Sequence, residues 1–318
     1  MADLDQLLQG SSRTFALTIP LLPEPARREV TVAYLLFRVA DTLEDAERWP
    51  RARRAGELAR FESLLCAEQL GLEPLAERWP ENDRQIAARI ARYRDDPPSL
   101  ERGYQALMEE LSAVIEALRA LEAPSREVIL KHLLVTVRGM AQGLREEDDE
   151  LFKLRSLAQL QRYCYLVAGV VGEMLTELFL LHAPLASAAA ALRAASREFG
   201  EGLQLTNILK DAGEDAQEQR QFIPDKLTRA SLFSLARRDL TAAIRYVAAL
   251  LYAQAPSGMV AFTALPVRLA IDTLREVERR GAGAKVSREQ LALAMDEVFA
   301  LLRGERKLEA VLHAPAEP

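Results

Sequence analysis

The chain has 318 residues, of which 49% are hydrophobic and 28% are charged, and its formal net charge is -6. This length and composition allow a sizeable core beneath a well-solvated surface. The negative balance, without a long run of lysine and arginine, argues against general nucleic-acid binding, so we expect no nucleic acid among the partners.

The two cysteines indicate a reducing compartment. Cys66 and Cys164 are far apart in the sequence and form no CxxC pair, so a disulfide framework or zinc site is not expected. The acidic N-terminus does not resemble a secretory signal, and the longest apolar run, residues 164–171, is too short to span a bilayer. The sequence therefore predicts a cytoplasmic protein without a transmembrane segment, although an oily substrate would be compatible with peripheral membrane contact.

Helical periodicity dominates the chain from the N-terminus onward. Apolar positions recur at helical spacing, and alternating strand patterns are nearly absent. Prolines fall between the apolar runs, and we expect Pro224, Pro256 and Pro266 to mark turns. With no internal repeat or low-complexity linker, the pattern predicts one all-α domain over residues 1–318, frayed from about 313. The clearest predicted helices are residues 30–45, 154–181, 186–215, 240–253 and 288–302.

Two segments share the form DxxED, residues 41–45 and 211–215. On a helix, positions i and i+4 share one face, so Asp41 should stack with Asp45, and Asp211 with Asp215. Stacked like charges destabilise a helix by a few tenths of a kcal/mol. A bound Mg²⁺ would offset this repulsion, because it prefers oxygen ligands and commonly links one or two carboxylates to a substrate's phosphates.

A single DxxED sequence in a helical protein is usually a solvated face. Here both copies end long apolar helices, where a plain solvated stripe is less expected and the helix dipole disfavours aspartate. The repetition in matching settings favours a functional interpretation.

Basic residues accompany both motifs. Arg38 lies one turn before Asp41, Lys210 precedes Asp211, Arg220 follows the second motif, and Arg13 lies near the N-terminus. They are either surface partners of the acids or ligands for phosphate, which the guanidinium geometry suits. The residues alone leave both interpretations open.

At these positions the chain resembles the squalene/phytoene synthase family, the head-to-head prenyl transferases. The resemblance covers roughly residues 10 to 285. It implies an all-α isoprenoid-synthase fold with a central cavity, whose two aspartate-rich helices hold Mg²⁺ between diphosphates. Four blocks carry it, namely SSRTFALTIPLLP from Ser11, YLLFRVADTLEDA from Tyr34, YCYLVAGVVGEMLTELF from Tyr163 and GLQLTNILKDAGEDAQEQRQFIP from Gly202.

The resemblance implies roles for individual residues. Tyr34 and Tyr163 match tyrosines that line the reaction site, although Tyr163 alone would be interpreted as a core aromatic. Mg²⁺, which Mn²⁺ can replace, is implied as cofactor, and NADPH is expected to contact Lys210 and Arg220. The implied metal-binding residues are Asp41, Glu44, Asp45, Asn207, Asp211, Glu214 and Asp215. The implied diphosphate-binding residues are Arg13, Arg38, Gln204, Asn207, Lys210 and Arg220.

The site has an expected apolar wall and one departure from the family pattern. A reacting carbocation must be kept from water, which requires apolar surroundings. Leu166 stands where many relatives have a second tyrosine, which puts pocket shape and cation contacts in doubt. The candidate wall residues, each of which would equally fit an ordinary core, are Phe15, Ile19, Leu35, Val167, Val170, Val171 and Leu205.

The favoured reaction joins two farnesyl diphosphates through presqualene diphosphate to squalene, with NADPH as reductant. Alternatives within the family are phytoene synthase, dehydrosqualene synthase and an enzyme that stops at presqualene diphosphate. A head-to-tail prenyl transferase or terpene cyclase would lack the paired DxxED blocks. An inactive relative serving as an assembly factor would usually have lost its aspartates. The sequence indicates no oligomeric state.

Overall fold

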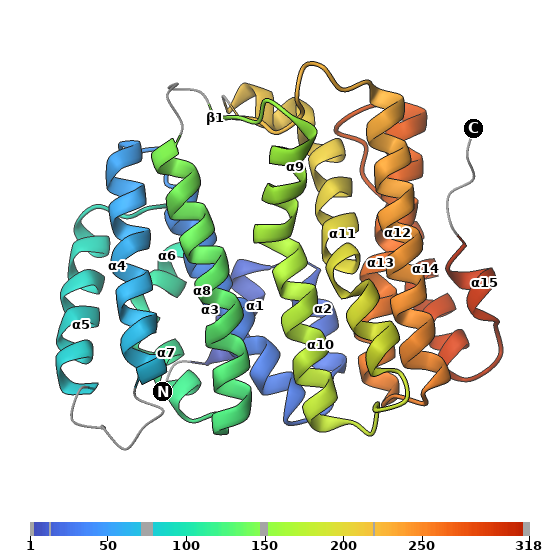
Figure 1. Cartoon of the computed structure of the whole chain (residues 1–318), viewed down its shortest axis with the longest axis horizontal. Coiled ribbons are helices and arrows are strands. Elements are labelled where there is room, and N and C mark those ends of the chain that lie inside the picture. Colours follow the sequence, from blue (N-terminus) through green and yellow to red (C-terminus); the bar gives the residue numbers. More distant parts are fainter. Residues whose placement is uncertain (1–2, 13, 71–78, 147–151, 219, 314–318) are drawn as a thin grey trace. The chain divides into compact units, whose positions relative to one another are not determined.

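The computed structural model describes residues 3–12, 14–70, 79–146, 152–218 and 220–313 (Figure 1). The described residues form helices and one pair of two-residue strands, which confirms the all-α prediction. Contacts divide the chain into two compact units. The N-terminal unit comprises Met1–Pro20 with Glu24–Glu146, and the C-terminal unit comprises Leu21–Pro23 with Glu147–Pro318. The expectation of a single domain stays a prediction.

The N-terminal unit is built around α3, whose apolar face supplies much of its core. Val32, Leu35, Leu36 and Val39 are fully buried, and this helix packs against α1, α4, α6, α7 and α8. In Figure 1, α4 and α8 lie side by side. The helices are α1 (Leu4–Ser11), α2 (Phe15–Thr18), the 3-10 helix η1 (Ile19–Leu21, which runs into the other unit), α3 (Ala26–Glu44), α4 (Arg51–Leu70), α5 (Trp79–Asp95), α6 (Arg102–Glu109), α7 (Leu111–Arg119) and α8 (Ala123–Glu146).

The C-terminal unit is organised around α11, its longest helix. This helix packs against α10, α12 and α13, and α11 and α12 are adjacent in Figure 1. The elements are β1 (Phe152–Lys153), α9 (Leu157–Cys164), the π-helix η3 (Tyr165–Gly169), α10 (Val170–His182), α11 (Ala189–Gln217), β2 (Arg220–Gln221), α12 (Arg229–Tyr252), α13 (Ser257–Arg280), α14 (Arg288–Leu302) and α15 (Leu308–Val311).

Most of the predicted helices are present, but several begin or end at residues other than those predicted. The prediction for Arg288–Leu302 matches α14, which begins at a capping box formed by Ser287 and Gln290. The predicted turn at Pro266 is wrong, because this proline lies inside α13. Pro266 is buried, and the packing of α13 against its neighbours can outweigh the loss of one backbone hydrogen bond.

Two helical segments are long and apolar enough to cross a membrane by length and composition alone. Residues 157–182 have a hydropathy of 1.7 and Ser257–Arg280 one of 1.2, among the described residues. The first segment contains the apolar run 164–171 and extends well beyond it. Within the protein 50% and 78% of these apolar stretches are buried, and core helices pass the same test, so they are weak evidence for a span. Cys66 is half-buried and Cys164 is buried, and both are free thiols.

Candidate active site

The first acidic motif lies where α3 ends. Asp45 is the C-terminal cap residue, and its N–H donates to the carbonyl of Asp41 at 2.8 Å. The two aspartates are therefore one helical turn apart, as predicted. Both lie at the negative end of the helix dipole, where a carboxylate is unfavourable. The arrangement concentrates negative charge that a cation would stabilise.

The environment of Asp41 supports this view. Although 31% of its side chain is exposed, the carboxyl is surrounded by protein atoms. Burial raises its pKa to about 6, an effect that the nearby Arg38 opposes and Asp45 reinforces. Arg38 Nη1 lies 3.4 Å from Asp41 Oδ2. One guanidinium therefore compensates the carboxylate only in part, which leaves room for a further positive charge.

Arg38 and Tyr34 stand one and two turns before this acid on the same face of α3. Arg38 Nη2 donates to the Tyr34 hydroxyl at 3.2 Å, and that hydroxyl donates to the Ser11 carbonyl at 2.8 Å. The Phe15 ring packs against the Tyr34 ring with centroids 5.5 Å apart. The structure therefore brings together the predicted tyrosine, arginine and aspartate.

A cation that sequence reasoning missed lies at the end of α3. Arg54, near the start of α4, donates from Nη1 to the carbonyl of Glu44 at 2.9 Å. A positive group at a helix C-terminus interacts favourably with the dipole and satisfies one of the last carbonyls. Arg54 thus links α4 to the backbone of the first acidic motif. It belongs to an arginine-rich stretch, residues 48–54, that looked like ordinary surface.

The second acidic motif lies near the C-terminal end of α11 and carries a basic partner at each acid. Lys210 Nζ lies 3.1 Å from Asp211 Oδ2, and Arg220 Nη2 lies 3.7 Å from Asp215 Oδ1. Lys285 Nζ lies 3.7 Å from Glu214 Oε1. Lys285 was not predicted, since no motif marks it in the sequence.

The segment that carries Lys285 is tied to the motif through its backbone. The N–H of Gly283 donates to the carbonyl of Lys210 at 2.7 Å. Gly283 has a φ of 83°, which L side chains rarely adopt. A glycine is therefore needed for the loop between α13 and α14 to reach α11 in this way.

The two amide residues before the second motif lie on the same helix. Lys210 Nζ donates to Asn207 Oδ1 at 3.5 Å, and Asn207 is exposed. Gln204 is half-buried one turn earlier. Positions 204, 207 and 211 share a face by helical spacing, so both amides lie in line with Asp211.

Tyr163 belongs to a cluster of three aromatic rings in the C-terminal unit. Its ring lies 5.8 Å from that of Phe152 and 4.9 Å from that of Phe222, between centroids. The strands β1 and β2 pair in parallel with Phe152 opposite Arg220, and the Arg220 guanidinium carbon lies 6.0 Å from the centre of the Phe222 ring. The short strand pair therefore brings Arg220, and with it Asp215, to the neighbourhood of Tyr163.

The predicted apolar wall divides into two groups. Ile19, Leu35, Val170 and Leu205 are at most 1% exposed, as expected for core residues. Phe15, Val167 and Val171 are half-buried, so part of each side chain is accessible. Leu166 is also half-buried and lies within the π-helix η3.

The two motifs belong to different units. Arg13 lies outside the described residues. Among the residues that the structure describes, no group of three or more aspartate, glutamate, histidine or cysteine side chains is arranged to hold a metal ion. Each motif instead offers a pair of carboxylates, which matches the habit of Mg²⁺ to take one or two protein carboxylates and fill its remaining positions with phosphate oxygens and water.

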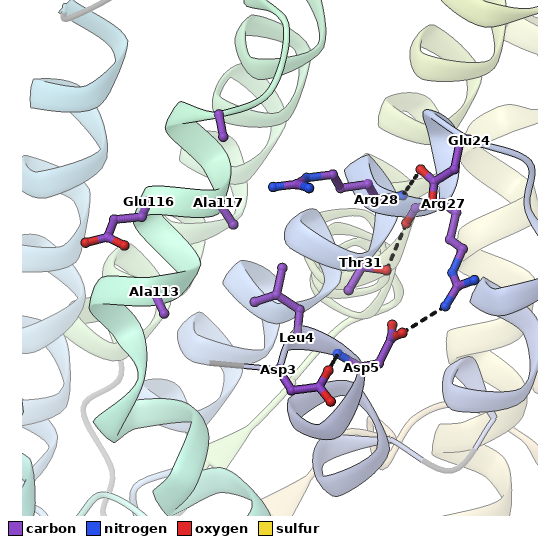
Figure 2. A pocket seen from close by; sticks show the side chains of 11 residues that line it. Asp3, Leu4, Asp5, Glu24, Arg27, Arg28, Thr31, Ala113, Glu116 and Ala117 are labelled. Atoms are coloured by element: carbon purple, nitrogen blue, oxygen red, sulfur yellow. Dashed lines mark hydrogen bonds and ion pairs between the residues drawn. The ribbon is translucent and has the colours of Figure 1, made fainter. Parts of the chain in front are cut away.

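Figure 2 shows a cavity of about 490 Å³ in the N-terminal unit that contains none of the predicted site residues. Its acids outnumber its bases, and Arg27 is paired with Asp5 at 2.8 Å. This balance does not suit a diphosphate. The lining residues are Asp3, Leu4, Asp5, Glu24, Arg27, Arg28, Thr31, Ala113, Glu116, Ala117 and Ala120.

The helical fold and its two cation-flanked DxxED motifs define a class of all-α proteins with paired aspartate-rich helices. The squalene/phytoene synthase family model matches residues 8–295. The chain therefore belongs to the squalene/phytoene synthase family, which confirms the resemblance found in the sequence.

Individual relatives agree with this assignment. The chain is 28% identical over 225 residues to a squalene synthase of Gibberella zeae, a match that covers 69% of this chain and 42% of that protein. It is 30% identical over 225 residues to squalene synthase of Schizosaccharomyces pombe, covering 70% and 44%. The matched part thus spans less than half the length of these relatives.

Solved structures show the same fold. A complex of TcSQS with a ligand has a TM-score of 0.70 at 22% identity, covering 99% of this chain and 92% of that one. A dehydrosqualene synthase in complex with a ligand has a TM-score of 0.60 at 20% identity, covering 95% of each chain. At these identities the likeness establishes the fold alone.

Proposed function

We propose that this protein is a Mg²⁺-dependent prenyl transferase that condenses two farnesyl diphosphates head to head, through presqualene diphosphate, to squalene. The observation that carries the proposal is the repeated pairing of acids and bases. Asp41 lies beside Arg38, and Asp211 and Asp215 lie beside Lys210 and Arg220. Carboxylates that bind metal ions and cations that bind phosphate are the two kinds of group that diphosphate departure needs.

The aspartates of both motifs fit Mg²⁺ by their donor chemistry, since they offer only oxygen atoms and Asp41 is a partly compensated carboxylate. Asp41, Asp45, Asp211 and Asp215 would hold the ions, supported by Glu44, Glu214 and Asn207. When bound, Mg²⁺ neutralises charge on the departing diphosphate. Arg38, Lys210 and Arg220 contribute positive charge from the protein that also neutralises the departing diphosphate. The planar guanidinium of Arg38 can donate two parallel N–H bonds to diphosphate oxygens.

In the first half-reaction the allylic C–O bond of one farnesyl diphosphate breaks, and the electron pair leaves with the diphosphate. The double bond of the second molecule attacks the resulting allylic cation, and loss of a proton closes the cyclopropane ring. The released diphosphate accepts that proton, either directly or through the hydroxyl of Tyr34 or Tyr163, which passes its own proton on. The half-buried apolar side chains of Phe15, Val167 and Val171 keep water from the cation.

The second half-reaction is proposed on the family relationship. Reductive rearrangement of presqualene diphosphate to squalene needs a hydride, for which NADPH is the proposed donor. Lys210 and Arg220 offer positive charge for its phosphates, but both are already paired with acids of the second motif.

A product analysis tests the proposal. The purified protein is incubated with farnesyl or geranylgeranyl diphosphate, with and without Mg²⁺ and NADPH, and the lipids are extracted and identified. Squalene from the farnesyl substrate, only with Mg²⁺ and NADPH together, is the expected outcome. Phytoene as the faster product would overturn the choice of substrate. Dehydrosqualene or accumulated presqualene diphosphate in the presence of NADPH would overturn the reductive step alone.

We further propose that the protein works in the cytoplasm with peripheral membrane contact for hydrocarbon release. Its substrates are charged at one end and oily at the other, while its product is entirely apolar. Fractionation of cells into cytosol and membranes, with a salt wash of the membranes, tests this location. Resistance of the protein to a carbonate wash would contradict it.

A further inference from the structure

Arg38 contacts two tyrosine rings, and only one of them was expected. Its guanidinium carbon lies 5.5 Å from the ring centre of Tyr34 on the same helix. It lies 5.7 Å from the ring centre of Tyr104, on α6. Both distances fall within the range in which an aromatic ring attracts a cation. Tyr104 is in none of the four motif blocks, so no sequence pattern marks it.

The position of Tyr104 is set by a close backbone contact between α1 and α6. A side-chain carbon on Gly103 would lie 1.8 Å from the carbonyl oxygen of Gly10, so only glycine fits there. The residue that follows each glycine in the sequence contacts the Arg38 site. Ser11 accepts the Tyr34 hydroxyl through its carbonyl, and Tyr104 reaches Arg38. The contact thus connects both tyrosines to one rigid junction.

The surroundings of Arg38 fix the direction of its donors. Nη1 is directed to Asp41 at 3.4 Å and Nη2 to the Tyr34 hydroxyl at 3.2 Å, and Nε is buried without a hydrogen-bond partner in the described residues. Desolvation acts to lower the pKa of Arg38, but Asp41, Tyr34 and Tyr104 outweigh it and raise the pKa. An arginine held in one orientation loses less conformational freedom when it binds an anion.

A core-filling role would explain Tyr104 less well. Tyr104 is only half-buried, and it lies close enough to Arg38, Glu101 and Asp41 to interact with their charges. Burial raises its pKa, and Arg38 opposes that rise, so the phenol stays neutral. A neutral aromatic face next to a guanidinium stabilises the cation without taking one of its N–H donors.

We propose that Tyr104 is a positioning residue that holds the Arg38 guanidinium ready to receive a diphosphate. The proposal rests on the proposed function, because it takes diphosphate as the anion that Arg38 binds. It extends the site to α6, which contains none of the family motifs. It also makes the ring of Tyr104, and not its hydroxyl, the group that matters.

Binding of inorganic pyrophosphate at a fixed Mg²⁺ concentration, measured by calorimetry, tests the proposal. Tyr104→Leu should weaken binding about three- to tenfold, as expected for loss of a cation–π contact. Tyr104→Phe keeps the ring and should bind like the wild type. Tyr252→Leu, at a tyrosine that is 70% exposed on α12 of the other unit, is the matched control and should change nothing.

Steady-state kinetics separates positioning from a general structural role. In Tyr104→Leu the KM for farnesyl diphosphate should rise more than kcat falls, and adding Tyr104→Leu to Arg38→Ala should weaken pyrophosphate binding no further. Unchanged binding in Tyr104→Leu, or equal losses in the Leu and Phe variants, would overturn the proposal. Since pyrophosphate binding needs no turnover, absence of squalene in the product analysis would refute the proposed function without deciding this test.

Discussion

Gly200 lies so close to Ala168 that a methyl group on it would stand 2.0 Å from the Ala168 carbonyl oxygen. Gly172 has the same relationship to Ser196, at 1.9 Å. These two contacts pack η3 and α10 directly onto the backbone of α11. They couple the helix that follows Tyr163 to the helix that bears the second acidic motif.

The glycine contact predicts a large effect from a small substitution. Gly200→Ala should lower the free energy of unfolding by about 1–3 kcal/mol, because a packed backbone cannot move aside. Gly213→Ala on the same helix is the control, since nothing lies within 4 Å of the added carbon, and it should stabilise by about 0.5–1 kcal/mol. Urea unfolding followed by circular dichroism measures both. Equal stabilities would contradict the close contact.

The acidic motifs should be needed for catalysis and not for folding. Asp41→Asn and Asp211→Asn should each lower kcat by at least about 10²-fold, because each removes a ligand for the charge that neutralises the leaving group. Their melting temperatures should stay level or rise, since repulsion is relieved. Asp5→Asn, in an exposed pair with Arg27, should leave kcat unchanged. Full turnover of the wild type in excess EDTA would refute the metal requirement.

Arg38 should not tolerate lysine. A lysine lacks the planar donors that serve Asp41 and Tyr34 together, so Arg38→Lys should lower kcat/KM at least about tenfold. Arg27→Lys provides a control on the same helix, because Arg27 forms an ion pair that is largely exposed to solvent. Similar kinetics for both variants would indicate that Arg38 serves only as a surface ion-pair partner of Asp41.

Ile19 is one of the candidate wall residues, and we expect it to limit the length of the prenyl chain as well as to stabilise the core. Because it is 1% exposed, Ile19→Ala should lower the free energy of unfolding by about 2–5 kcal/mol. It should also raise the share of products made from geranylgeranyl diphosphate, but modestly, since one methylene discriminates by about 1–3 kcal/mol. Leu8→Ala, at a residue 2% exposed on α1, should lose stability with an unchanged product ratio. A changed ratio in both variants would indicate a nonspecific effect.

Stability should depend on pH through Glu201. Burial raises the pKa of this carboxyl above the ordinary 4.5, despite its bond to Arg197. The folded state therefore holds the proton more tightly than the unfolded state, and stability is lost as pH rises from about 4.5 through the folded pKa. Glu201→Gln avoids this loss. Its melting temperature relative to wild type should increase between about pH 4 and pH 8, and a constant difference would contradict the raised pKa.

The sequence allowed a good prediction of fold class and of the acidic helices. Helical periodicity depends only on local order, and the C-terminal ends of α3 and α14 lie within a residue of the predicted limits. The first turn of α3 was missed, because this helix begins at Ala26 and not at residue 30. The turn predicted at Pro266 was wrong because it relied on the tendency of proline to interrupt a helix, which is a property of the local sequence. The packing that stabilises α13 around this proline involves residues that are distant in the sequence. The predicted helix over residues 154–181 also contains a π-helix. The sequence did not reveal this π-helix, because one wide turn barely changes the spacing of apolar residues.

Residues of the site that act through distant contacts escaped prediction. Tyr104 and Lys285 contact Arg38 and Glu214 across long stretches of sequence, and Arg54 contacts the Glu44 carbonyl from the next helix. None has a neighbour that marks it, and an isolated basic or aromatic residue in a helix is usually unremarkable. The Gly10–Gly103 contact was equally hidden, because a glycine's closeness to another backbone is a property of the folded chain.

The π-helix Tyr165–Gly169 has a consequence for sequence change in this segment. A π-turn holds one residue more than an α-turn, so a single deletion between positions 165 and 169 would restore regular α geometry. Because the wide turn accommodates that extra residue, the helix before it would keep its register relative to α10, and Tyr163 would still face Phe222. A single deletion within α10 itself has no extra residue to remove, so everything before it would rotate by about 100° about the helix axis. The chain should therefore accept the loss of one residue in the π-turn far more readily than in α10.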